Sequence, residues 1–230
     1  MSVRWAVLRP TRPTRGAGKH EAARRLIGNT ALVVFAKAPV AGQVKTRLIP
    51  ALGAAGAAML AQRMLAHALE QALALPVAHL ELCVSPDPAH PAFAREVADS
   101  GGRLHLTRQG DGDLGERMHR ALTRLLARHD KALLMGTDAP GLTTAVLGQA
   151  AAALDGHDVV FVPALDGGYA LIGLTRSAPE IFQGMTWSTP RVMAETRERA
   201  RRAGLRWAEL EAVADIDEPK DLVHLPEGWS

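Results

Sequence analysis

The sequence has little cysteine and few aromatic residues. Cys83 is the only cysteine among 230 residues, so no internal disulfide can form. Aromatic residues make up only 4% of the chain, which predicts a core of Ala, Leu and Val. We find no apolar run near the roughly 18 residues that a membrane-spanning helix needs. We therefore expect a cytoplasmic protein without a membrane span.

The net positive charge of the chain comes from its first residues. Residues 1–28 hold seven Lys or Arg and one Glu, a net charge of +6, whereas the whole chain carries +3. The remaining residues therefore carry −3, which predicts a basic, flexible N-terminal arm at 1–28 and a single domain at 29–230. A basic arm can bind phosphate backbones without sequence preference. A solvated extension is the simpler interpretation, so we do not expect nucleic acid as the partner.

Apolar runs alternate with amphipathic stretches through residues 29–230. The runs predict strands at 31–36, 80–85, 103–107, 132–136, 158–163, 169–174 and 206–210. The amphipathic stretches predict helices at 54–75, 91–100, 115–128, 144–154 and 190–203, with a last helical turn from 218. This alternation favours an α/β fold with a mostly parallel central sheet and helices on both faces. Because such sheets bind ligands beyond the carboxyl ends of their strands, we look for the site there.

The loop after the first predicted strand carries three cations, Lys37, Lys45 and Arg47. Gly42 lets backbone amides approach an anion in the same loop. One charge pair at about 4 Å contributes roughly 4 kcal/mol at an effective dielectric near 20, so a few cations would hold a diphosphate. The loop is not a Walker A motif, because Val44 and not glycine precedes the lysine. The alternative is a solvated basic loop.

Three aspartates are candidate metal ligands. Asp138 follows the fourth predicted strand, and its carboxylate oxygens suit Mg²⁺ or Mn²⁺ bridging to phosphates. It would serve equally well as a turn or capping residue. Asp215 and Asp217 alternate near the C-terminus, which places both on one face of an extended segment. We expect one to bind the same ion and the other to cap the helix beginning near Pro219.

Two further loops carry candidate binding residues. Asp166, Gly167 and Gly168 form a strong hairpin signal, and the two glycines also leave room for a sugar or phosphate. Residues 109–118 form a loop that enters a helix, with Asp113 as a candidate N-cap. That loop could also shape a base or ribose pocket. We therefore include Asp113 and Arg117 among the candidate nucleotide-binding residues.

Six segments, taken in order, resemble the DUF2064 family, bacterial glycosyltransferase-like proteins of the nucleotide-diphospho-sugar transferase superfamily. They are FAKAPVAGQVKTRLIPALG from Phe35, GDLGERM from Gly112, GTDAPGL from Gly136, PALDGGYALIGL from Pro163, WSTP from Trp187 and DIDEPKDL from Asp215. The resemblance implies a Rossmann-like GT-A fold. The first segment is also similar to the opening of 2-phospholactate guanylyltransferases.

The resemblance implies roles for the same residues. Lys37, Lys45 and Arg47 would contact nucleotide phosphates, and Asp166 with its two glycines would face the transferred group. Asp138 would bind the metal, and Asp217 or Asp215 would approach that ion from the C-terminal side. Leu165 stands where a second acid often precedes the loop aspartate in the family.

We expect a metal-dependent transferase with Mg²⁺ or Mn²⁺ as cofactor. Its partners would be a nucleotide or nucleotide-sugar donor and a small-molecule acceptor that the sequence does not identify. Glycosyl transfer is the leading hypothesis, with Asp166, Lys45 and Arg47 as its catalytic residues. The alternatives are nucleotidylyl transfer, which releases pyrophosphate, and a non-catalytic nucleotide-binding module. The nucleotide base, the sugar and the oligomeric state have no signal in the sequence.

Overall fold

The computed structural model describes residues 27–229. Most of the predicted basic arm lies outside these residues. Ile27, which the sequence assigns to the arm, is only 5% exposed and packs in the main hydrophobic core. The folded body therefore includes at least the last two residues of the range predicted for the arm.

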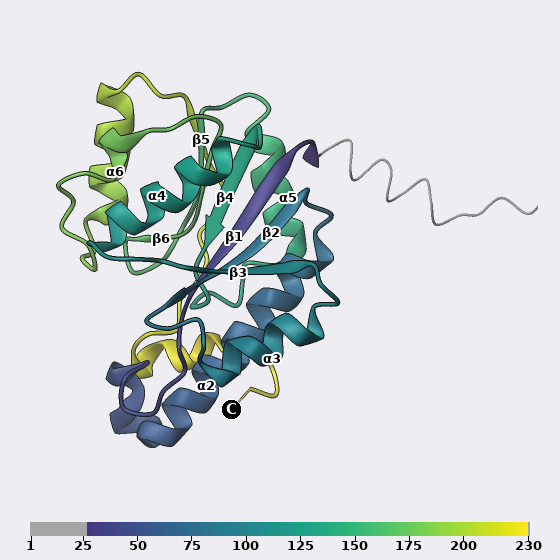
Figure 1. The fold of residues 1–230 in the computed structure, drawn as a ribbon. Helices are drawn as coiled ribbons and strands as arrows, with labels where there is room; N and C mark the ends of the chain where they lie inside the picture. The colour runs from purple at the N-terminus through teal and green to yellow at the C-terminus, as the bar shows by residue number, and fades with distance from the viewer. Residues whose placement is uncertain (1–26, 230) are drawn as a thin grey trace, which may run out of the picture.

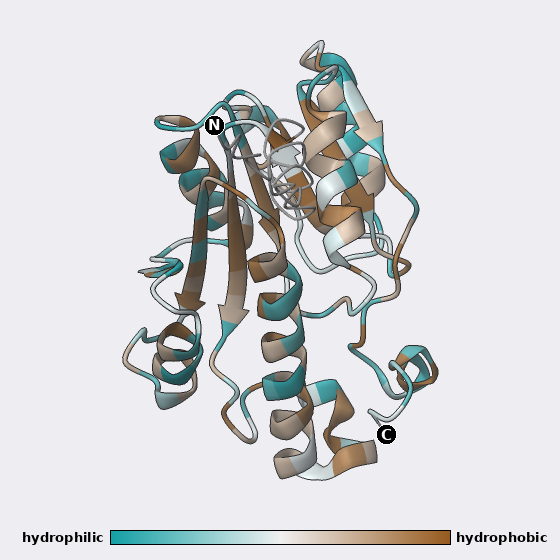
Figure 2. Ribbon diagram, turned by 90° about the vertical axis from the view of Figure 1, so that its right-hand side faces the viewer, coloured by the Kyte–Doolittle hydropathy of each residue, from teal (hydrophilic) through white to brown (hydrophobic). Residues whose placement is uncertain are grey.

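Seven strands form one sheet in the order β3-β2-β1-β4-β6-β5-β7. Their bounds are β1 Thr30–Lys37, β2 His79–Ser85, β3 Leu104–Arg108, β4 Lys131–Met135, β5 Val159–Pro163, β6 Tyr169–Leu174 and β7 Trp207–Glu209. Only β6 runs antiparallel to its neighbours β4 and β5. The strands are largely apolar, as the brown ribbons in Figure 2 show. The predicted mostly parallel α/β sheet is confirmed.

Helices cover both faces of the sheet (Figure 1). One face packs against α2 Ile49–Ala74, α3 Pro91–Asp99 and α5 Thr144–Ala153, through residues such as Leu65, Phe93 and Leu147. The other face packs against α4 Leu114–Leu126 and α6 Val192–Arg202, through residues such as Leu122 and Met193. Short 3₁₀ helices span Thr46–Leu48 (η1), Pro179–Ile181 (η2) and Pro219–His224 (η3).

Helix α2 begins earlier than the sequence predicts. It starts at Ile49, but Gly53 has a φ of 69° and a ψ of 166° and interrupts its first turn, so regular helix begins near the predicted residue 54. By length and composition alone, Thr46–Ala74 could cross a membrane. The expectation that no stretch reaches such a length was therefore too strong. Eight of the helix's residues, including Met64 and Leu69, are buried against the rest of the protein.

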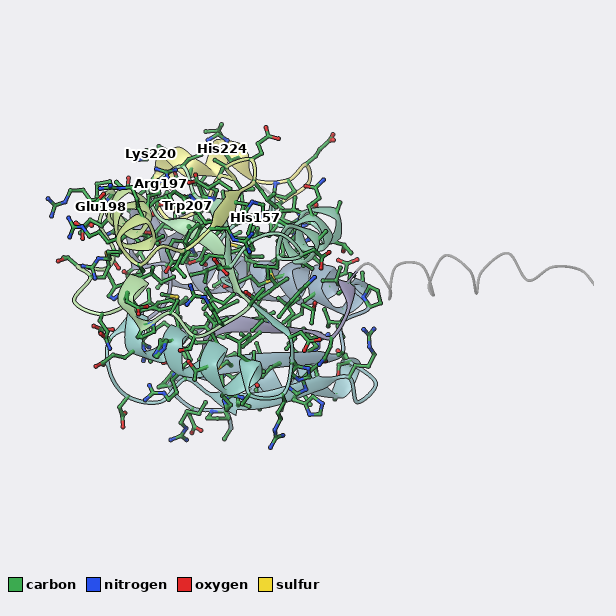
Figure 3. The ribbon with its side chains drawn as sticks, turned by 90° about the horizontal axis from the view of Figure 1, so that it is seen from above. His157, Arg197, Glu198, Trp207, Lys220 and His224 are labelled. Carbon is green, nitrogen blue, oxygen red and sulfur yellow. The ribbon has the colours of Figure 1, made fainter. Side chains whose placement is uncertain are left out.

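The far edge of the sheet is joined to α6 by one acid. Glu209 of β7 accepts two hydrogen bonds from Arg197 of α6, at 2.9 and 2.7 Å, and one from Trp207 Nε1 at 3.0 Å. Figure 3 shows Arg197 and Trp207 side by side at this edge. Strand β1 lies inside the sheet, between β2 and β4, where the strand order reverses. Open α/β sheets bind ligands at such a reversal.

Candidate functional site

Three segments that are distant in sequence meet beyond the carboxyl ends of β1 and β4. The C-terminal segment is drawn in by backbone bonds, from Val213 N to Pro163 O at 2.9 Å and from Ile216 N to Asp138 O at 2.8 Å. The Ile216 side chain is fully buried in a cluster with Leu48 and residues of α2. In Figure 1 the yellow C-terminal segment lies beside the purple start of α2. Backbone pairing and one apolar anchor therefore bring the C-terminal acids to the site.

Lys45 lies at the centre of this meeting point. Its side chain is only 4% exposed, and its Nζ lies 2.8 Å from Asp138 Oδ1 and 3.8 Å from Asp217 Oδ1. The same ammonium donates to the carbonyl oxygen of Ile216 at 2.5 Å. The structure thus brings together three residues predicted from separate motifs. The partners of the lysine are two carboxylates and a backbone carbonyl.

Arg47 and Lys37 lie at the rim. Arg47 Nη1 is 2.8 Å from Asp217 Oδ2 and 3.9 Å from Glu218 Oε1, and its side chain is 60% exposed. Lys37 Nζ donates to the carbonyl oxygen of Gln43 at 2.7 Å, which ties the loop back on itself. Gly42 has a φ of 80°, a conformation that glycine tolerates best. The exposed guanidinium remains within reach of a ligand at this rim.

Asp138 has a partner that its sequence context did not suggest. Asp138 Oδ1 forms an ion pair with Lys45 Nζ at 2.8 Å. The hydroxyl oxygen of Thr137 lies farther from the same Oδ1, at 3.4 Å. The side chain is 56% exposed, so the carboxylate reaches both a buried cation and solvent. His67 of α2 fixes the following turn, since its Nε2 lies 3.1 Å from the carbonyl oxygen of Pro140.

The oxygens around Lys45 fit a divalent cation in kind. Two carboxylates and a carbonyl are hard ligands of the type that Mg²⁺ and Mn²⁺ bind. Within residues 27–229, no three Asp, Glu, His or Cys side chains come close enough together to hold an ion by themselves. Asp138 and Asp217 would therefore bind such an ion only with the help of phosphate or water oxygens. Their role as metal ligands stays a prediction.

Asp215 lies on the other side of Ile216 and meets a different carboxylate. Burial raises the pKa of Asp215, and the nearby charge of Asp166 raises it further. The N-cap of η3 is Glu218, and Asp221 completes the capping box, since its Oδ2 accepts from the backbone amides of Glu218 at 2.7 Å and Asp217 at 3.1 Å. Neither of the two alternating aspartates is therefore used as the cap of η3.

The loop of Asp166, Gly167 and Gly168 connects β5 to antiparallel β6, so the hairpin interpretation is confirmed. Asp166 Oδ1 accepts from Gly168 N at 2.8 Å, which fixes the carboxylate over its own turn. Gly167 has a φ of 92°, and a Cβ there would lie 2.2 Å from the carbonyl oxygen of Pro190. Its own carbonyl accepts from Met193 N at 2.8 Å. The loop is thus packed directly against Pro190 and the first turn of α6.

The loop before α4 is held together by its own side chains. Asp113 is the N-cap of α4 and exchanges hydrogen bonds with Glu116, both at 2.9 Å, so the predicted cap is confirmed. Arg117 donates to Gln109 Oε1 at 3.1 Å and to the carbonyl oxygen of Asp113 at 3.2 Å. Both side chains therefore have structural partners, and their contact with a nucleotide stays a prediction.

Two groups that sequence reasoning missed organise this edge. Gln109 is 7% exposed, and its amide donates to Ala36 O at 3.2 Å and to Cys83 O at 3.1 Å, so it ties the ends of β1 and β2 together. A polar residue directly after β3 was the available signal. The carbonyl of Ile216 had no signal, because a backbone group looks the same at every position.

The comparisons with known proteins identify a family and a shared fold. A family model described as an uncharacterized protein conserved in bacteria (DUF2064) matches residues 68–189. A crystal structure from Desulfovibrio desulfuricans G20, of a protein provisionally named a nucleotide-diphospho-sugar transferase, is 33% identical. That match covers 85% of each chain with a TM-score of 0.77. None of the curated proteins searched matches this sequence.

More distant structures share the fold. The 4-diphosphocytidyl-2C-methyl-D-erythritol synthase of Anaerococcus prevotii DSM 20548 is 8% identical, with a TM-score of 0.57 over 86% of this chain and 96% of that one. The inositol-1-phosphate CTP transferase of T. maritima is 12% identical, with a TM-score of 0.52 over 86% and 92%. At these identities the likeness extends to the architecture alone.

Proposed function

The chain belongs to the DUF2064 family, and from that premise we propose that it transfers a group from a nucleotide-linked donor with the help of a divalent metal ion. The observation that carries the proposal is the convergence of Lys45, Asp138 and Asp217 beyond the carboxyl ends of β1 and β4. The position is the one where open α/β sheets bind their ligands.

The cations of the site suit the phosphates of the donor. Arg47 is exposed beside Asp217, where its guanidinium could bind a phosphate through two parallel hydrogen bonds. Lys45 adds a compact charge on a flexible stem. We assign both residues to neutralising the leaving phosphate group, because charge that develops there is the main barrier to its departure.

Asp138 and Asp217 are the residues that would hold the metal, with donor phosphates and water completing its shell. A bound Mg²⁺ or Mn²⁺ would supply further positive charge against the leaving group. Asp215 is half-buried next to Asp166, so we place it at the side of the transferred group as a second-choice ligand.

Glycosyl transfer is the reaction we propose. The bond from the anomeric carbon to the diphosphate oxygen breaks, and a bond from that carbon to an acceptor oxygen forms. Asp166 would take the acceptor's proton, because its carboxylate is held at the site by Gly168 and lies in an exposed loop. The acceptor would be a small molecule, and the reaction a cytoplasmic one.

The test has two stages. Melting temperatures are measured with ATP, GTP, CTP, UTP, UDP-glucose and GDP-mannose, each with Mg²⁺, with Mn²⁺ and with EDTA. A ligand that binds the native state raises the melting temperature in a concentration-dependent way. We expect at least one nucleotide-linked compound to do so only with metal. No shift with any of them would contradict the proposal.

The products then identify the reaction. Binding compounds are incubated with candidate acceptors and the released nucleotide is identified by chromatography. A nucleoside diphosphate indicates glycosyl transfer, whereas pyrophosphate indicates nucleotidylyl transfer at the same cations. Binding without either product would favour the non-catalytic module.

A further inference from the structure

The ammonium of Lys45 stands where the two candidate metal ligands meet. It lies 2.8 Å from Asp138 Oδ1, 3.8 Å from Asp217 Oδ1 and 2.5 Å from the carbonyl oxygen of Ile216. A lysine ammonium has three donors, so it is matched by three oxygens. The position at which carboxylate oxygens would gather around an ion is therefore filled by a cation of the chain itself.

The backbone of Lys45 indicates that this placement is specific. Its φ of 49° and ψ of 42° are left-handed, which is uncommon for a residue other than glycine. Sparsely populated backbone conformations persist where surrounding contacts fix them, and they gather at functional sites. The left-handed turn aims the side chain inward, where it is 4% exposed.

The lysine and a divalent ion would exclude each other. Both are cations that require the same carboxylate oxygens, and like charges a few Å apart repel strongly in a partly buried site. The lysine stem has several rotatable bonds, so the ammonium can move to a new partner without a change in the backbone. Phosphate oxygens of a nucleotide would provide that partner beside Arg47.

We propose that Lys45 keeps divalent metal out of the site until nucleotide phosphates draw its ammonium away. The inference rests on the proposed nucleotide-linked transfer and adds the order of binding. Before nucleotide binds, the lysine holds two carboxylates together that would otherwise repel each other. When phosphates arrive, they take the ammonium and complete the metal's oxygen shell, so metal enters with or after the nucleotide.

The test measures binding of Mn²⁺ alone, without nucleotide, by the loss of the free-ion signal in electron paramagnetic resonance. The full chain is compared with Lys45→Gln, which keeps hydrogen-bond donors but loses the charge, and with Lys45→Met. Both variants should bind Mn²⁺ at least about tenfold more tightly than wild type, within the usual range of coupling between sites. Folded variants with unchanged Mn²⁺ affinity would overturn the proposal.

Lys131 provides a matched control. Its side chain is 10% exposed, and its Nζ bonds Asp155 Oδ1 at 2.5 Å and the carbonyl oxygen of Ala151 at 3.0 Å. Among residues 27–229 it therefore has a carboxylate and a carbonyl as partners, but no second carboxylate within salt-bridge distance. Lys131→Met should leave Mn²⁺ affinity at the wild-type value. An equal gain in this variant would mean that loss of any buried lysine charge raises metal binding, which contradicts a specific role for Lys45.

A measurement on wild type covers the case in which neither Lys45 variant folds. Acetic anhydride modifies accessible amines, and mass spectrometry reports the acetylated fraction of each lysine. Lys45 should be protected, and Mn²⁺ alone should leave that protection unchanged. Increased acetylation of Lys45 with Mn²⁺ alone would show that metal displaces the ammonium unaided, and the proposal would be wrong.

Failure of this inference is distinguishable from failure of the proposed function. If nucleotide-linked compounds raise the melting temperature only with metal, while the Lys45 variants bind Mn²⁺ no better than wild type, only the binding order is rejected. If no nucleotide shifts the melting temperature, the transferase proposal is rejected by that result, whatever the Mn²⁺ titrations give.

Discussion

Two buried charges in this protein, Glu81 and Lys45, have very different surroundings. Glu81 in β2 is 1% exposed and binds Arg124 of α4 through two contacts of 2.6 Å. Thr107 adds a hydrogen bond of 2.5 Å, and His79 Nε2 lies 3.6 Å away. Lys45 is also buried, at 4% exposed, but its carboxylate partners are 56% and 38% exposed.

The difference favours a structural role for Glu81 and a ligand-binding role for Lys45. Burial alone would raise the pKa of Glu81, but the hydrogen bonds from Arg124 and Thr107 outweigh it and hold the pKa below its ordinary value. Both oxygens are satisfied by protein donors, so a ligand would gain nothing there. Around Lys45 the acids still face solvent, and an incoming cation or phosphate can rearrange the contacts. We call the Glu81 pair saturated, because protein donors bind both of its oxygens, and such a pair stabilises the fold. We call the Lys45 pair open, because its carboxylates still face solvent, and such a pair at a strand's carboxyl end can bind a ligand.

The largest expected effect comes from breaking the saturated pair. Arg124→Met leaves the Glu81 carboxylate buried without its main partner, and we expect the free energy of unfolding to fall by about 3 kcal/mol. Urea denaturation at pH 7 measures the loss. The deficit should begin to shrink as the pH falls towards the ordinary carboxyl range, because without Arg124 burial raises the pKa of Glu81 and protonation then removes the unpaired charge. Nucleotide binding should be unchanged, since the pair lies outside the site.

Arg197→Met is the matched control. Arg197 and Glu209 also form a two-contact pair, at 2.9 and 2.7 Å, but their side chains are 44% and 27% exposed. Water can replace the lost contacts, so the loss should be no more than about 1 kcal/mol. Equal losses in both variants would show that burial does not distinguish the two pairs.

The second prediction compares two glycines in loops of the candidate site, one tightly packed and one in open space. Gly167 has a φ of 92°, and an added Cβ would lie 2.2 Å from Pro190 O, whereas Gly42 has a φ of 80° and open space around it. Gly167→Ala should lower the free energy of unfolding by about 2 kcal/mol through strain and clash, and Gly42→Ala by about 1 kcal/mol through strain alone. Thermal denaturation of both variants measures the difference. A loss in Gly42→Ala as large as that in Gly167→Ala would contradict the prediction.

The third prediction concerns a substitution that breaks the open pair of Lys45 and Asp138. Asp138→Asn keeps the size of the side chain but removes the nearest counter-charge of the buried Lys45 ammonium, so we expect a stability loss of about 1 kcal/mol, limited because Asp217 and the Ile216 carbonyl remain as partners. Metal-dependent nucleotide binding should weaken by at least about tenfold, which corresponds to roughly 1.4 kcal/mol. Calorimetric titration with a compound from the melting panel, with Mg²⁺ and then with EDTA, measures it. Unchanged metal dependence would mean that Asp138 is not a ligand.

Much of the fold could be predicted from the sequence because β4 and β5 are continuous apolar runs between polar turns. The direction of β6 was the exception to the parallel pattern, and only the hairpin signal of Asp166 and Gly167 indicated it. The early start of α2 could not be predicted, because Gly53 breaks the helical period after its first residues. Local turn chemistry therefore decided the outcome where hydrophobic periodicity did not.

The site was predicted as a set of residue types and not as a geometry. Lys45, Asp138 and Asp217 each stood out by their position after a strand or before a helix. The sequence held no sign that the lysine would lie between the two acids. Lys45 and Ile216, whose carbonyl is the third partner of the ammonium, are 171 positions apart in the chain. Its carbonyl, like the Gln109 bridge between strands, belongs to the packing of the whole chain. Such contacts depend on the tertiary fold more than on any motif.

The smallest expected effect concerns His79, which lies beside the saturated pair. Its ring stacks on His105 at 4.6 Å and on His129 at 5.5 Å, measured between ring centroids. Burial lowers the pKa of His79, His105 and His129 lower it further, and Glu81 only partly opposes them. The unfolded chain, with a pKa near 6.5, therefore takes up a proton more readily than the folded protein.

Stability should consequently be complete above pH 6.5 and fall as the pH drops through that value, by less than about 1 kcal/mol. His79→Gln removes this titrating group while keeping a polar side chain. Melting temperatures of wild type and variant are compared between pH 7.5 and pH 5.5, with the shared loss from other groups cancelling. Wild type should lose more stability over this interval than the variant. Equal losses would mean that the histidine stack does not disfavour the charged form of His79, and that Glu81 compensates its neighbours in full.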